Sequence, residues 1–172
     1  MSEKTLSSIR KLSWWTQAYG AVLLLRAFLY LGAYGPESIR SIFRAANAAQ
    51  IWLLVAQWIL GLAWLYTAWR RVPEPCRRTY DNRKVEPSEA VWKLFIPFYG
   101  FYWLFVANIG LCSALERHAK QVRLQRNGPS SFALVTCLVQ LVPLVGLLLA
   151  PLFWFTLMFR IDLLHAEVEA ME

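Results

Sequence analysis

Four long stretches of the chain are apolar and almost free of charge, and this pattern limits its fold more than any other feature. They cover residues 14–34, 48–69, 91–115 and 131–159, and the charged residues inside them are Arg26 and Lys93. A helix needs about 20 apolar residues to cross the hydrocarbon core of a bilayer. Helices also satisfy their own backbone hydrogen bonds there. The pattern therefore predicts an all-α polytopic membrane protein with four transmembrane helices.

The composition agrees with a membrane protein and excludes other classes. Of the 172 residues, 58% are hydrophobic and 17% are charged, whereas soluble domains have about 45–50% apolar and about 25% charged residues. The length fits a single membrane domain over 1–172, and three cysteines are too few for a disulfide-rich secreted domain. The net charge of +7 comes mostly from basic residues that flank the apolar runs. We therefore expect membrane lipids as partners, and no nucleic acid.

Prolines interrupt the third and fourth runs and predict kinks at Pro97 and at Pro143 and Pro151. Two of these prolines lie in similar segments, FIPFYGF and LVPLVGL, where Gly100 and Gly146 follow the proline by three residues. Proline frees a carbonyl one turn earlier, and glycine lets a neighbouring backbone come close. Either the segments form an internal repeat of broken helices, as in transporters, or the match is a coincidence.

The positions of lysine and arginine favour an orientation with both termini in the cytoplasm. With four crossings, the cytoplasmic basic residues are Lys4, Arg10, Lys11, Arg70, Arg71, Arg77, Arg78, Arg83, Lys84 and Arg160, and the outer ones are Arg40, Arg44, Arg117, Lys120, Arg123 and Arg126. The segment 116–126, however, has the character of a basic cytoplasmic helix. If the third run turns back at Pro97 instead of crossing, this segment moves inside, and this re-entrant topology is the alternative.

The segment 70–89 is the main polar loop, with three prolines and many charges. Its basic residues are candidate contacts for a protein partner or for lipid headgroups, and they are Arg70, Arg71, Arg77, Arg78, Arg83 and Lys84.

Arg26 is the most informative single residue, because an ionised guanidinium inside a span costs at least a few kcal/mol unless it meets polar groups. Gln57, Asn108 and Gln140 lie in the other runs and form with Arg26 a candidate intramembrane polar site. Alternatively, Arg26 reaches the outer headgroups, about 12 Å away along its helix, and the amides only join helices.

Small side chains follow one another at helical spacing in the third run, at Ala107, Gly110 and Ala114. This stripe predicts close helix packing, within the chain or between protomers.

The sequence predicts no enzymatic activity, no cofactor and no metal site. Cys76, Cys112 and Cys137 have no CxxC spacing, and His118 and His165 are far apart in the sequence and outside the apolar runs. No GxSxG, HExxH, P-loop or dinucleotide motif occurs, and the four runs contain no Asp or Glu. Cys76 follows a proline and precedes two arginines, so we expect an unmodified thiol, with a lowered pKa or an attached acyl chain as the alternative.

A set of residues between 64 and 97 follows the pattern WLYxAxRxxP, then PxxAV after a polar loop, then FIP in an apolar run. They are Trp64, Leu65, Tyr66, Ala68, Arg70, Pro73, Pro87, Ala90, Val91, Phe95, Ile96 and Pro97. Over 64–115 the chain thereby resembles the uncharacterised bacterial multi-pass proteins of domain-of-unknown-function family 4328. Family members often continue with Asn-Leu and a second proline, where this chain has FYGFYW. The resemblance implies a multi-pass domain of a bacterial cytoplasmic (inner) membrane and no known activity.

These features predict a non-enzymatic partner-binding or assembly module, such as an accessory subunit or an immunity-type protein, which works with a protein partner or as a homo-oligomer. The alternative is an oligomeric small channel or transporter for an anion or lipid headgroup. Arg26 and the kinks at Pro97 and Gly100 and at Pro143 and Gly146 would line its path. A third interpretation is binding of anionic lipid through the loop 70–89.

Overall fold

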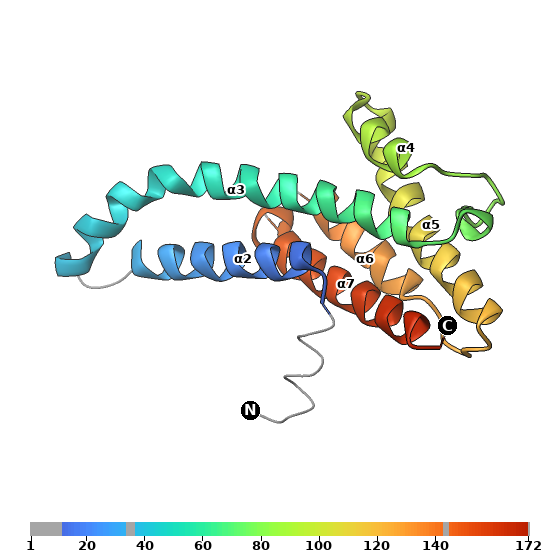
Figure 1. The fold of residues 1–172 in the computed structure, drawn as a ribbon. Coiled ribbons are helices and arrows are strands. Elements are labelled where there is room, and N and C mark those ends of the chain that lie inside the picture. Colours follow the sequence, from blue (N-terminus) through green and yellow to red (C-terminus); the bar gives the residue numbers. More distant parts are fainter. Residues whose placement is uncertain (1–11, 34–36, 143–144, 172) are drawn as a thin grey trace.

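The computed structural model describes residues 12–33, 37–142 and 145–171, with the backbone alone at 33, 37–48, 145, 147 and 148. Most of these residues are helical, and none of them belongs to a β-strand. The elements are α2 (Trp14–Ala33), α3 (Glu37–Arg71), η1 (Glu74–Cys76), α4 (Pro87–Trp92), η2 (Lys93–Phe95), α5 (Tyr99–Gln121), α6 (Ser130–Leu141) and α7 (Val145–Glu169) (Figure 1). The predicted all-α class is confirmed.

Two segments are long and apolar enough to cross a membrane by length and composition, Ala49–Arg71 in α3 and Leu149–Glu169 in α7. The 12 residues of α6 extend only about 18 Å at 1.5 Å per residue, well short of a hydrocarbon core about 30 Å thick. The described residues thus provide two candidate spans, where the sequence predicted four.

The helices pair into three hairpins. In the first, α2 runs antiparallel to α3, and the far part of this pair extends beyond the other helices (Figure 1). In the second, α4 and η2 fold back against the first turns of α5. In the third, α6 packs against α7, where Trp154 donates a hydrogen bond to Gln140.

The third and fourth apolar runs are hairpins and not single kinked helices. The third run turns back at 96–98, as in the re-entrant alternative. In the fourth, α6 ends at Leu141 and α7 begins at Val145, so the predicted single helix over 131–159 is wrong. A residue before proline avoids the helical conformation, and Ile96 and Val142 are both extended there, with ψ of 119° and 113°. Pro143 lies outside the described residues, and Pro151 lies within α7.

The two hairpins share one backbone hydrogen bond at the start of the second helix. The Gly100 N–H donates to the Ile96 carbonyl at 2.7 Å, and the Gly146 N–H donates to the Val142 carbonyl at 2.7 Å. A Cβ atom on Gly100 would lie 2.3 Å from the Leu94 carbonyl oxygen, and one on Gly146 would lie 2.8 Å from the Val139 oxygen. Each glycine therefore lets the second helix start against the last turn of the first. An internal repeat of FIPFYGF and LVPLVGL stays a prediction.

The connections between the hairpins meet at one end of the molecule, here called the polar end. Arg117 near the end of α5 donates to the Arg78 and Thr79 carbonyls at 2.8 and 2.7 Å, and Arg126 lies 3.3 Å from Glu167 near the end of α7. The expected placement of Arg117 and Arg126 across a membrane from the loop 70–89 is therefore wrong. The physical reason is the turn at 96–98, which returns the chain to the side it came from.

The core lies near the polar end, and the exposed apolar side chains lie toward the hairpin turns. Trp64, Trp69 and Trp103 are fully buried between α3, α5 and the loops. Large apolar side chains are exposed on every hairpin, and they include Leu24, Phe28, Leu31, Ile51, Trp52, Ile59, Phe95, Phe98, Phe101, Leu138, Leu141, Leu149 and Leu152.

Candidate functional site

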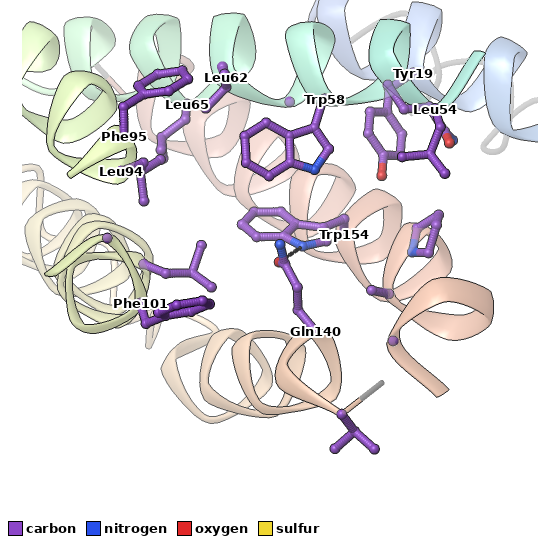
Figure 2. Close-up of a pocket in the computed structure, with 18 of the residues that line it drawn as sticks. Tyr19, Leu54, Trp58, Leu62, Leu65, Leu94, Phe95, Phe101, Gln140 and Trp154 are labelled. Atoms are coloured by element: carbon purple, nitrogen blue, oxygen red, sulfur yellow. Dashed lines mark hydrogen bonds between the residues drawn. The ribbon is translucent and has the colours of Figure 1, made fainter. Parts of the chain in front are cut away.

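A cavity of about 580 Å³ lies among the three hairpins. Its walls come from α2, α3, the turn between η2 and α5, the end of α6 and the start of α7. Figure 2 shows Trp58 of α3 and Trp154 of α7 pointing toward each other in it, with Phe95 and Phe101 on one side and Tyr19 and Leu54 on the other. The volume lies within the range of small-molecule sites, about 300–1,000 Å³.

Three of the four predicted intramembrane polar residues line this cavity, namely Arg26, Gln57 and Gln140. The Arg26 guanidinium donates a short hydrogen bond to the Gln57 side-chain oxygen and a longer one, 3.5 Å, to that of Gln50. These contacts join α2 to α3. Arg26 is half-buried and meets neutral amide oxygens through these bonds.

Gln57 has an amide nitrogen that is unpaired within the described residues, and the Gln140 side chain accepts a hydrogen bond. Gln57 is 4% exposed, and its amide nitrogen has no hydrogen-bond partner among the described residues. The Gln140 side-chain oxygen accepts a hydrogen bond from the Trp154 indole at 2.6 Å (Figure 2).

Asn108, the fourth predicted polar residue, does not join this group. It is buried in α5, where its amide nitrogen donates to the Leu104 carbonyl at 2.8 Å and its side-chain oxygen has no partner among the described residues.

The residues predicted for kinks and packing lie in two places, the cavity wall and the buried part of α5. Pro97, Gly100, Gly146 and Pro151 line the cavity. Ala107, Gly110 and Ala114 are buried in α5. The Ala107 carbonyl accepts a hydrogen bond from the Trp69 indole at 3.2 Å, and a Cβ on Gly110 would lie 3.0 Å from the Thr79 methyl group. In the described residues, this stripe packs within the chain.

The basic residues of the loop 70–89 mostly hold the loop itself. Arg77 donates hydrogen bonds to the Val72 and Arg70 carbonyls, and Arg78 donates one to the Asn82 side-chain oxygen. Lys84 forms an ion pair with Glu74 at 2.6 Å. Arg83 lies 3.4 Å from Glu89 and over the Trp103 ring. Lys84 holds the pKa of the Glu74 carboxyl below its usual value through this hydrogen bond. The loop is thus a folded unit.

Sequence reasoning missed a buried carboxylate at the polar end. Asp162 in α7 is 1% exposed and accepts hydrogen bonds from the Ser13 backbone at 2.9 Å, the Thr16 hydroxyl at 2.6 Å and the Trp64 indole at 3.1 Å. Arg71 lies 3.9 Å away. Asp162 therefore joins α2, α3 and α7. Its spacing from Met158, Ile161 and His165 on one helix face is the signal that would have revealed it.

The two histidines, which lie outside the apolar runs of the sequence, are also buried. His118 and His165 are 5% and 2% exposed. Within the described parts of the chain, no three His, Cys, Asp or Glu side chains are arranged to hold a metal ion.

Cys76 is buried against the end of α5, where its thiol donates to the Gln121 side-chain oxygen at 3.0 Å. Burial raises the pKa of this thiol, and the nearby Arg117 offsets only part of that effect. The alternative of a lowered pKa is therefore wrong, because desolvation outweighs the neighbouring charges.

Comparison with known proteins adds no relative. The chain matches no family model, and no curated protein or solved structure is significantly similar to it. The resemblance of residues 64–115 to family 4328 stays a prediction.

Proposed function

We propose that this chain is a small, non-enzymatic integral membrane protein that binds an amphipathic small molecule in the cavity among its hairpins. The observation that carries the proposal is the cavity itself, whose apolar walls and few polar groups lie where the surrounding surface is apolar. Binding sites for small molecules have this composition.

The exposed surface supports insertion in lipid. Phe98 at the second turn is 88% exposed with a φ of 60°, a conformation unfavourable for a bulky residue. An exposed aromatic ring at such a position gains nothing in water, whereas in lipid its burial stabilises the protein. Trp14, Tyr66 and Tyr80 are exposed nearer the polar end, where headgroup-level aromatic rings are expected.

In the proposed topology the second and third hairpins enter the membrane from the side of the polar end and return to that side, while the first hairpin reaches deeper into the membrane. The cytoplasmic face of a bacterial inner membrane suits the polar end, because cytoplasmic loops are rich in arginine and lysine. This topology differs from four crossings in one testable way: the loops 72–86 and 122–129 lie on the same side.

Cysteine labelling tests this topology. In the full chain, Tyr80→Cys and Gln125→Cys each place a thiol at an exposed position, while the native cysteines are buried. A membrane-impermeant maleimide is expected to label both variants from the same side of sealed vesicles. Labelling from opposite sides would restore the crossing topology and contradict the proposal.

Ligand binding is tested with long-chain probes. The purified chain in mild detergent is expected to retain oleate or oleyl alcohol on gel filtration. Gly61→Leu is expected to lose the probe, because Gly61 lines the cavity and the nearest side-chain atom to its Cβ position is 3.9 Å away. Retention of neither probe by the wild-type chain would remove fatty acids and fatty alcohols as ligands, and failure to retain phosphatidylglycerol and diacylglycerol as well would refute the proposed function.

A partner-binding or immunity-type role is the second candidate, and the exposed basic residues of the polar end support it. Arg70 and Arg78 are exposed, and neither forms an ion pair within the described residues. Replacing both with glutamine is expected to abolish co-purification of a protein partner without reducing retention of a lipid probe. Unchanged co-purification would remove this candidate.

A further inference from the structure

We infer that the molecule held in the cavity is an anionic amphiphile, whose oxyanion, a carboxylate or phosphate, binds Arg26 and Gln57 while its hydrocarbon part contacts Trp58 and Trp154. The inference rests on the proposed function and names the class of ligand. Its basis is the charge and hydrogen-bonding capacity of the cavity wall.

The positive charge of the cavity wall comes from Arg26. None of the described residues that line the cavity is Asp or Glu. Its hydrogen bonds go to the neutral side-chain oxygens of Gln57 and Gln50. A guanidinium surrounded by apolar side chains is costly without a counter-ion. A ligand that brings a negative charge therefore supplies a counter-ion that the described residues of the cavity wall do not provide.

The cavity wall also has a hydrogen-bond donor that is unpaired in the described part of the chain. The Gln57 side-chain oxygen accepts a hydrogen bond from Arg26, and the buried Gln57 amide nitrogen has no partner among the described residues. A buried donor without an acceptor is unfavourable. The Gln140 oxygen is taken by Trp154 in the same way. The cavity thus offers a guanidinium and amide N–H groups, a set that suits a group with several acceptor oxygens and no proton to donate.

The apolar part of the cavity wall indicates what the rest of the ligand is. Beyond these donors the wall is apolar, with Leu54, Trp58, Leu62, Phe101 and Trp154 among its residues (Figure 2). A small inorganic anion would leave this surface without contacts. A hydrocarbon chain buries it, so an amphiphile fits better than a free anion.

The experiment compares ligands that differ only in charge. Oleate is compared with oleyl alcohol, and phosphatidylglycerol with diacylglycerol, by equilibrium binding to the full chain in mild detergent. We expect the anionic member of at least one pair to bind about tenfold or more tightly, as befits a charge-assisted hydrogen bond. Preference within the first pair assigns a carboxylate, and preference within the second assigns a phosphodiester.

Two variants connect the preference to Arg26. Arg26→Gln is expected to remove it, and Arg70→Gln, which removes an exposed cation at the polar end, is expected to leave it unchanged. Gln57→Glu places a carboxylate beside Arg26, so it is expected to abolish the preference while the unfolding temperature does not fall. This variant keeps the test valid if Arg26→Gln fails to fold.

Each result has one meaning. Equal binding of charged and neutral probes by the wild-type chain would overturn the anionic inference and leave the proposed function standing. Displacement of oleate by millimolar inorganic phosphate would overturn the amphiphile in favour of a free anion. Binding of none of the four probes would refute the proposed function itself.

Discussion

Replacing Asp162 with asparagine is expected to lower the free energy of unfolding by about 1.5–3 kcal/mol, and replacing it with alanine by about 3–5 kcal/mol. The carboxylate is fully buried, with two donors on one oxygen and the Trp64 indole on the other. Asparagine keeps one oxygen, so it loses at least one charge-assisted hydrogen bond. Alanine leaves all three donors without this acceptor.

The assay is unfolding of the purified chain in mild detergent by increasing fractions of SDS, followed by near-UV circular dichroism. Glu169→Gln is the matched control, because it removes a carboxylate from an exposed position at the end of the same helix, and we expect a change below about 0.5 kcal/mol. Trp64→Phe and Asp162→Asn together are expected to destabilise less than the sum of the single changes, since both remove the same hydrogen bond. If Asp162→Asn unfolds like the wild-type chain, this carboxylate does not join the three helices.

Gly100→Ala is expected to destabilise the chain by about 1–3 kcal/mol in the same assay, because its Cβ would clash with the Leu94 carbonyl. Gly61→Ala, whose Cβ has room, is the control, and equal effects of the two changes would contradict the tight turn. Phe98→Gly is expected to raise the free energy of unfolding in detergent, because glycine tolerates the positive φ, and to weaken association with vesicles in a flotation assay. Unchanged flotation would show that the Phe98 ring does not enter lipid. Cys76 is expected to react with iodoacetamide at pH 8 more slowly than a free thiol, because burial raises its pKa; reaction at the rate of the unfolded chain would refute this.

The sequence predicted the first helix more reliably than the hairpin turns. The first run was predicted over 14–34, and α2 covers Trp14–Ala33. The fourth run was expected to kink at Pro143, but two separate helices pack against each other there. In lipid, an unbroken apolar run is compatible with one crossing or with a hairpin, because both faces are apolar in either case. The turn depends on the close contact at Gly146, which hydropathy does not measure.

The candidate site was predictable in part for a similar reason. Arg26 and Gln57 stand out because polar residues are rare in apolar runs, and they are in contact. Asn108 has the same signal, but it bonds to its own helix. Asp162 was missed because a charge just past an apolar run marks its end in a hydropathy argument. Its burial depends on donors from α2 and α3, which only the tertiary structure brings together.

The hydrogen bonds of Asp162 to Ser13 and Thr16 span 149 and 146 residues of sequence, and this separation dictates the order of assembly. During synthesis the first hairpin emerges long before its acceptor exists. It can pair early and contact α4 and α5, but its hydrogen bonds to Asp162 form only after the last helix has left the ribosome. A chain that stops before residue 162 would carry the Thr16 hydroxyl and the Trp64 indole without this acceptor, so truncated copies are expected to be degraded while complete ones persist.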